Sequence, residues 1–182
     1  MHRFRTIALI CALFAALPAL AQETEIEGSH FRVAEYWWGG AIADSQGQFD
    51  YCDVNMNHGS AIRLTYALRR DDVFVVMVYI KGADLGPGAT IDVGLASDIF
   101  SADRLEARML DPETFAVLVP GLEAAFTAVR PGSYLSVQLD RRRNYLIPTP
   151  GGQDALDAAR ACFNRYSAPD NGSGAGSGPM SP

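Results

Sequence analysis

The residues best suited to chemistry lie close together between positions 50 and 60. Asp50, Asp53 and His58 supply two carboxylates and an imidazole, and Ser60 follows closely. A hydrolase needs a nucleophile, a general base and an orienting acid, so a small hydrolase with a site around His58, Asp50 and Asp53 is one hypothesis. The chain has no G-x-S-x-G motif to present a serine nucleophile. His58 is therefore interpreted first as a residue of a turn.

The spacing Asp53-x-Asn55-x-Asn57 is similar to the start of a calcium-binding loop. An EF-hand needs glycine at its sixth position and glutamate at its twelfth, where this chain has His58 and Leu64. Alternation along a strand would also spread the three oxygens over an open face. The preferred interpretation is a solvated strand face, and we predict no catalytic, metal or cofactor site.

Two adjacent tryptophans, Trp37 and Trp38, are the other notable pair. Neighbouring residues of a strand point to opposite faces of the sheet. One indole is therefore expected to fill the core while the other lies on the surface, where it would contact a ligand or partner. The alternative is that both indoles pack under loops or against the termini.

The N-terminal segment has the composition of a cleaved secretory signal. Arg3 and Arg5 precede an uncharged run that ends in Ala19-Leu20-Ala21. The run is shorter than the roughly 20 apolar residues that span a bilayer. We therefore predict a signal peptide over 1–21, no transmembrane anchor after cleavage, and a periplasmic or secreted protein.

Removal of this segment leaves two cysteines, Cys52 and Cys162. In an exported chain such a pair is typical of a structural disulfide. Free thiols remain an alternative, and a redox role is less favoured because C-x-x-C spacing is absent. Cys52 alternates with polar residues, and Cys162 lies on the apolar stripe of an expected helix. Both sulfur atoms should therefore face the core.

Period-two patterns dominate the remaining chain and predict a mainly antiparallel β-sheet or sandwich of seven to nine strands. One or two helices should pack on it, the last of them C-terminal, which makes the fold class α+β. The run Val73–Ile80 is apolar on both faces, so we expect a central strand that is covered on each side. Strands are expected at 37–44, 52–57, 61–69, 73–80, 91–95, 104–109, 114–119 and 134–140, and helices at 122–129 and 154–166.

Composition sets the domain organisation and excludes some partners. The expected domains are a flexible lead-in over 22–29, a single β-rich domain over 30–166 and a disordered Gly/Ser/Pro tail over 167–182. The chain has 15 basic and 21 acidic residues, and loss of Arg3 and Arg5 takes its formal net charge from −6 to −8. Binding to nucleic acid is not expected, because it needs a basic face.

Several short motifs resemble a family of small exported proteobacterial proteins of unassigned function. They are Trp38-Gly39, Phe49-x-x-Cys52, Ile91-Asp92, Leu122-x-x-x-Phe126, and Gly152-x-x-Ala155-Leu156 leading to Cys162. More distantly, the chain is similar to the invasion-associated locus B proteins. The resemblance implies an exported, non-enzymatic accessory or host-interaction role and supplies no catalytic residues.

Together these observations favour a periplasmic or secreted binding or interaction module without catalytic activity. The sequence does not name the partner, and an envelope or host protein is the class that this location offers. The exported hydrolase is the second hypothesis. A purely structural envelope protein is a third, and it would expose a broad apolar patch.

Overall fold

The computed structural model describes residues 23–86, 90–97, 101–128, 132–139 and 143–168. The predicted signal peptide and most of the predicted tail lie outside these ranges. The described residues form one antiparallel sheet of eleven strands and two helices. In chain order these are β1 Thr24–Glu25, β2 Phe31–Val33, β3 Trp37–Ala43, β4 Phe49–His58, β5 Ile62–Arg69, β6 Val73–Ile80, β7 Thr90–Ala96, β8 Ser101–Asp111, β9 Thr114–Pro120, α1 Leu122–Ala128, β10 Tyr134–Gln138, β11 Asn144–Pro148 and α2 Gly152–Ser167.

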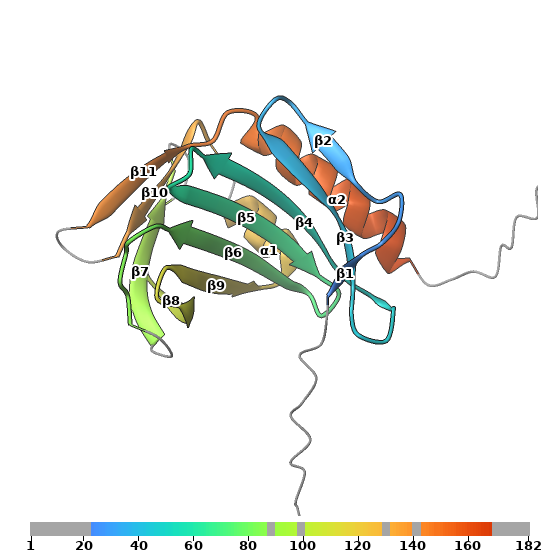
Figure 1. Cartoon of the computed structure of the whole chain (residues 1–182), viewed down its shortest axis with the longest axis horizontal. Helices are drawn as coiled ribbons and strands as arrows, with labels where there is room; N and C mark the ends of the chain where they lie inside the picture. Colours follow the sequence, from blue (N-terminus) through green and yellow to red (C-terminus); the bar gives the residue numbers. More distant parts are fainter. Residues whose placement is uncertain (1–22, 87–89, 98–100, 129–131, 140–142, 169–182) are drawn as a thin grey trace, which may run out of the picture.

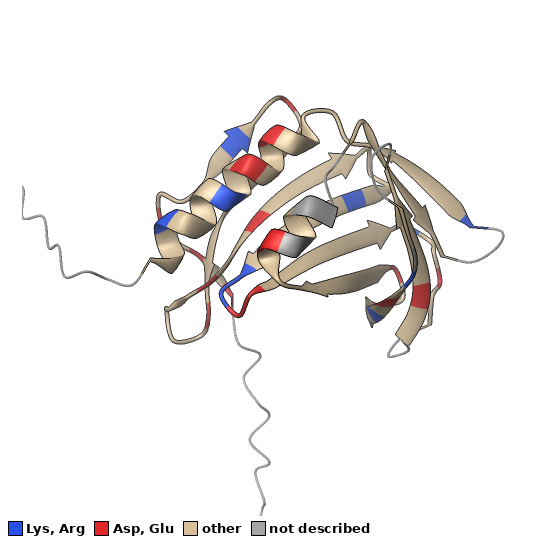
Figure 2. Ribbon diagram, turned by 180° about the vertical axis from the view of Figure 1, so that it is seen from behind, with Lys and Arg blue, Asp and Glu red and all other residues tan. Residues whose placement is uncertain are grey.

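The sheet has the strand order β1-β3-β4-β5-β6-β9-β8-β7-β10-β11, and β2 pairs with β3 as well. It curls strongly, and both helices lie on one side of it (Figure 1). The same helices stand in front of the sheet when the molecule is turned around (Figure 2). We call the side that carries the helices the inner face and the opposite side the outer face.

The inner face holds one continuous apolar core. Strands β3 to β11 and both helices contribute to it, so residues from both ends of the curled sheet pack in the same core. Aromatic rings run through its centre, with Trp37 stacked on Tyr66 and Tyr66 stacked on Phe74. Core residues from the helices include Leu122, Ala125, Ala155, Leu156 and Ala159.

The predicted class and the two helices are confirmed, but the strand count of seven to nine was too low. The additional strands are β1, β2 and β11. The first two have two and three residues, which is too few for alternation to be detected. β11 forms an edge of the sheet and ends at Pro148, and proline normally counts against a strand.

The lead-in over 22–29 is more ordered than expected. β1 pairs with β3, which places Thr24 opposite Ala43. Ser29 is buried, and its hydroxyl accepts a hydrogen bond from the Ala41 amide at 2.9 Å. The ordered domain therefore begins before residue 30, because these contacts fix the segment against the edge of the sheet.

β6 is central, as predicted, but it is covered on one side only. Its inner residues Phe74, Val76 and Val78 are fully buried. No described helix or second sheet lies over its outer residues, and Met77 and Tyr79 remain partly exposed. The expectation of cover on both sides was wrong, because both helices pack on the inner face.

Glycine at position 39 permits the close approach of β3 and β4 at the edge of the curl. A Cβ atom at Gly39 would lie 2.0 Å from the backbone oxygen of Asp53 and 2.9 Å from the ring of Phe31. Only glycine fits so near another backbone. Glycine at position 39 therefore has a structural reason in this strand.

Candidate functional site

The residues of the hydrolase hypothesis lie along a single strand. Asp50, Asp53 and His58 all belong to β4, and His58 is exposed at its end. A strand rises about 3.3 Å per residue, which separates Asp53 from His58 by roughly 16 Å. Asp50 instead lies 3.9 Å from the Arg70 guanidinium. The structure does not bring these three side chains together.

Asp53 takes part in a polar network on the outer face. One of its carboxylate oxygens accepts a hydrogen bond from the Gly40 amide at 3.2 Å, and the other accepts one from the Asn55 side-chain amide at 2.8 Å. Asn55 in turn accepts a hydrogen bond from the Thr65 hydroxyl at 2.7 Å. Each of these polar groups has a hydrogen-bond partner within the network. The hydrogen bonds link β3, β4 and β5.

Burial raises the pKa of the Asp53 carboxyl, although hydrogen bonds from Asn55 and Gly40 oppose the shift. The negative charge of Glu25 raises the pKa further. Within the described parts of the chain, no group of three or more His, Cys, Asp or Glu residues is arranged to hold a metal ion.

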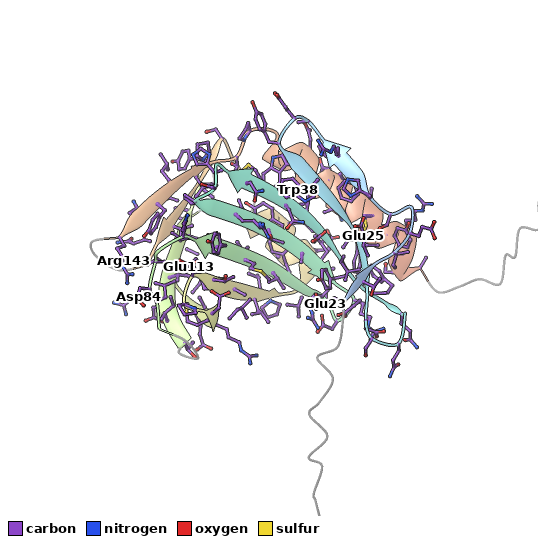
Figure 3. The ribbon with its side chains drawn as sticks, in the orientation of Figure 1. Glu23, Glu25, Trp38, Asp84, Glu113 and Arg143 are labelled. Carbon is purple, nitrogen blue, oxygen red and sulfur yellow. A yellow bond between two sulfur atoms is a disulfide. The ribbon has the colours of Figure 1, made fainter. Side chains whose placement is uncertain are left out.

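The two tryptophans lie on opposite faces of β3. Trp37 is 1% exposed in the core, and its indole nitrogen donates a hydrogen bond to the Pro150 carbonyl at 2.8 Å. This bond ties β3 to the residues that precede α2. Trp38 is partly exposed on the outer face (Figure 3), opposite Asn55 of β4. Only Trp38 is therefore placed to contact a ligand.

Cys52 and Cys162 form a disulfide with a Cα–Cα distance of 6.1 Å, within the usual range for such a bond. It joins the inner face of β4 to α2. The bond lies in a small satellite core with Ala41, surrounded by aromatic side chains. Phe49 contacts both Phe163 and Tyr166 of α2. A buried disulfide with aromatic neighbours is a structural bond, and it fits an oxidising compartment.

The outer face of β5, β6 and β9 carries an apolar strip. Ala67, Val75 and Ala116 are less than 10% exposed and pack together across the three strands. Leu118 and Leu110, which lie nearby on β9 and β8, are 52% and 50% exposed. The apolar strip therefore continues into residues that water contacts directly.

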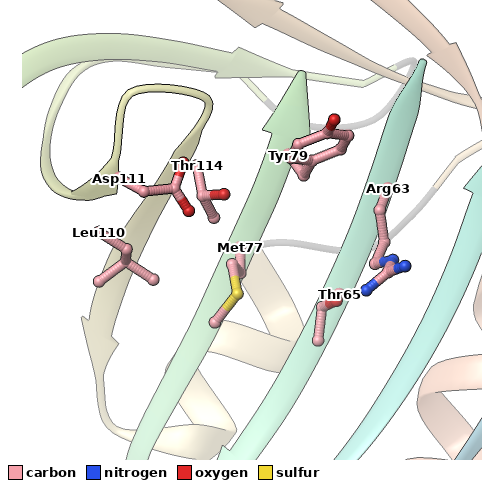
Figure 4. A pocket seen from close by; sticks show the side chains of 7 residues that line it. All are labelled: Arg63, Thr65, Met77, Tyr79, Leu110, Asp111 and Thr114. Atoms are coloured by element: carbon pink, nitrogen blue, oxygen red, sulfur yellow. The ribbon is translucent and has the colours of Figure 1, made fainter. Parts of the chain in front are cut away.

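A groove of about 350 Å³ adjoins this strip on β5, β6, β8 and β9 (Figure 4). Met77 and Leu110 provide its apolar surface, and Arg63 and Asp111 provide opposite charges. Its volume is in the range of small-molecule sites. The lining residues are Arg63, Thr65, Met77, Tyr79, Leu110, Asp111 and Thr114.

The register of the strands places the two charges at opposite sides of the groove. Arg63 pairs with Tyr79, Tyr79 with Thr114, and Thr114 with Asp111. Three spacings of about 4.8 Å put the Cα atoms of Arg63 and Asp111 roughly 14 Å apart. The groove is thus basic on one side, acidic on the other and apolar between them.

The charged groups of the groove are held by neutral or backbone partners. Arg63 donates from Nε to the side-chain oxygen of Asn57 at 3.1 Å. Asp111 accepts a hydrogen bond from the Glu113 amide at 2.7 Å. A hydrogen bond from the Thr114 hydroxyl and that from Glu113 lower the pKa of Asp111. The Asp111 carboxylate therefore stays ionised at neutral pH.

A tyrosine marks the centre of the groove. Reduced contact with water and a hydrogen bond with Glu113 raise the pKa of the Tyr79 hydroxyl, so it remains neutral. Glu113 also accepts a hydrogen bond from the Gly82 amide at 2.5 Å. Tyr79 and Met77 line the groove between its two charged residues.

Arg63, Tyr79 and Asp111 carry no motif that marks them as site residues in the sequence. A signal existed in the pattern, since Val73, Val75 and Met77 make the outer side of β6 apolar as well. Their pairing across four strands could not be read from the sequence, because it depends on β9 lying between β6 and β8.

Comparisons with known proteins do not assign the chain to a family or a function. No family model matches the chain, and neither the curated proteins nor the solved structures contain a match. The relationship to the exported proteobacterial family and to the locus B proteins stays a prediction. No helix in the described ranges is both long and apolar enough to cross a membrane.

Proposed function

We propose that this chain is an exported binding module, without catalytic activity, that engages its ligand on the outer face of the sheet. The observation that carries the proposal is a groove with opposite charges beside the exposed side chains of Leu110 and Leu118. Exposed leucine side chains beside a groove are a feature of surfaces that bind a ligand or partner. Trp38 lies on the same face and supplies a further aromatic contact.

The second hypothesis, a hydrolase, lacks a comparable geometric argument. Its three residues are spread along β4, whereas a general base must lie within hydrogen-bond reach of its substrate proton. The Asp53 carboxylate is also occupied by hydrogen bonds from Gly40 and Asn55. Binding on the outer face needs no such rearrangement.

Amide chemical-shift mapping tests the proposal. The ¹⁵N-labelled protein, expressed from Gln22, is titrated with the low-molecular-weight fraction of a periplasmic extract. We expect shifts in β5, β6, β8 and β9 and no chemical change in the fraction. The absence of shifts, or shifts confined to other elements, would contradict the proposal. Turnover of a component that is lost in His58→Ala would favour the hydrolase.

A further inference from the structure

The groove in Figure 4 has features that narrow its ligand class, provided that the outer face is the binding face as proposed above. It presents a cation, an apolar floor and an anion in that order across the strands. A ligand that matches all three has a negative group, an apolar body and a positive group. Polar groups at fixed positions in an apolar pocket determine how a ligand is oriented.

The cationic side has free hydrogen-bonding capacity. Arg63 uses Nε for Asn57, and the described residues provide no partner for its two terminal nitrogens. A guanidinium donates two parallel hydrogen bonds to a carboxylate, which is a strong and directional contact. The hydrogen bond to Asn57 orients the guanidinium through Nε, and the two terminal nitrogens remain able to donate to a ligand.

The anionic side is also available to a ligand. No lysine or arginine among the described residues pairs with Asp111, whose partners are the Glu113 amide and Thr114. A carboxylate accepts about four hydrogen bonds, so capacity remains for an ammonium group. Glu113 adds a second negative charge at the same hairpin. This side therefore favours a cation and disfavours a second anionic group.

We infer that the groove binds a short peptide with a free amino terminus and a free carboxylate, about three residues long and with apolar side chains. The Cα atoms of Arg63 and Asp111 are roughly 14 Å apart across β5, β6, β9 and β8. An extended tripeptide of about 10 Å fits this span. Its carboxylate contacts Arg63, its ammonium group contacts Asp111, and its apolar side chains pack on Met77 and Leu110.

Calorimetric titration with three peptides tests the assignment on the unaltered protein. The probes are Leu-Ala-Leu, its N-acetyl derivative and its C-terminal amide. Each modification removes one charge and keeps the apolar body, so each should weaken binding by about tenfold or more. Equal affinity for all three peptides, or no binding of Leu-Ala-Leu, would overturn the assignment.

Variants locate each charge. The Arg63→Gln protein should bind the C-terminal amide peptide and the free peptide with equal affinity. The Asp111→Asn protein should bind the N-acetyl peptide and the free peptide with equal affinity. Arg69→Gln is the matched control, because Arg69 belongs to the same strand but pairs with Asp71 outside the groove. Unchanged discrimination in Arg63→Gln would contradict the inference.

The peptide titration and the extract titration together test the ligand class and the binding face as two separate proposals. If Leu-Ala-Leu fails to bind while the extract fraction still shifts amides of β5, β6, β8 and β9, the peptide assignment is wrong and the proposed function stands. If neither ligand source produces shifts on the outer face, both fail.

Discussion

The two faces of the same strands differ in what covers them. On β6, Phe74 and Val76 are fully buried beneath the helices, whereas Met77 and Tyr79 line an open groove. Polar groups follow the same division: the Asp53 network and Arg63 lie on the outer face, and the inner core is almost entirely apolar. The comparison indicates that the inner face forms the buried core and that part of the outer face stays accessible to solvent.

The largest expected effect comes from the bond that joins α2 to the inner face. The disulfide closes a loop with a sequence separation of 110 residues, and the chain-entropy relation gives about 4–5 kcal/mol for such a loop. The double variant Cys52→Ala/Cys162→Ala should lose about that much free energy of unfolding in urea. Reduced wild-type protein serves as the control and should behave similarly. Equal stability of the oxidised and reduced proteins would show that the bond contributes little.

A matched pair of truncations compares the faces directly. Phe74→Ala removes a fully buried ring that contacts Tyr66 and Phe126, and should cost about 3–5 kcal/mol. Leu118→Ala removes a side chain that is 52% exposed on the outer face, and should change stability by about 0.5 kcal/mol or less. Both values come from urea denaturation. Similar losses for the two variants would mean that the outer face is also part of the stabilising core.

Alanine substitutions at Gly39 and Gly94 test the close approach of β3 and β4. Gly39→Ala places a methyl group against the Asp53 backbone oxygen and should destabilise the protein by about 1–3 kcal/mol, as overpacking does. Gly94→Ala is the control, since the added methyl group would lie 3.4 Å from its nearest neighbour, the Cβ atom of Gln138, which is an ordinary van der Waals distance. Thermal unfolding of both variants gives the comparison. A harmless Gly39→Ala would contradict the close approach of β3 and β4.

The smallest effect concerns pH. Because burial raises the pKa of Asp53 in the folded protein, the folded state binds this proton more tightly than the unfolded state does. Stability relative to Asp53→Asn should therefore fall as pH rises from the unfolded pKa through the folded one, and then remain constant. Urea midpoints of the two proteins between pH 4 and 7 measure the difference. A difference that grows in the opposite direction would mean that hydrogen bonding outweighs burial.

Much of the fold could be predicted because alternation reports directly on burial. Cys52 and Cys162 were placed on the core side by two independent periodicities, and the structure joins them. The separation of Trp37 from Trp38 followed from the same rule. β1 and β2 were not predicted, because they are too short to show alternation of apolar and polar residues. β11 was not predicted, because it contains proline at a sheet edge.

The groove could not be predicted in the same way. Arg63, Met77 and Asp111 are each ordinary residues of amphipathic or apolar strands, and they meet only through the order β5-β6-β9-β8. His58 and Asp53 are close in sequence, which suggests a shared site, yet an extended strand separates neighbours that a helix or turn would bring together. Proximity in sequence was therefore a poor guide to a site here.

Methyl-resolved NMR tests the division between the two faces most directly. Protein labelled in the methyl groups of Met, Leu and Val is titrated with Leu-Ala-Leu. The account predicts contacts between the peptide and the methyl groups of Met77 and Leu110, and none with those of Val76 or Leu156. Contacts with Val76 or Leu156 instead would place the ligand inside the curl and contradict the assignment of binding to the outer face.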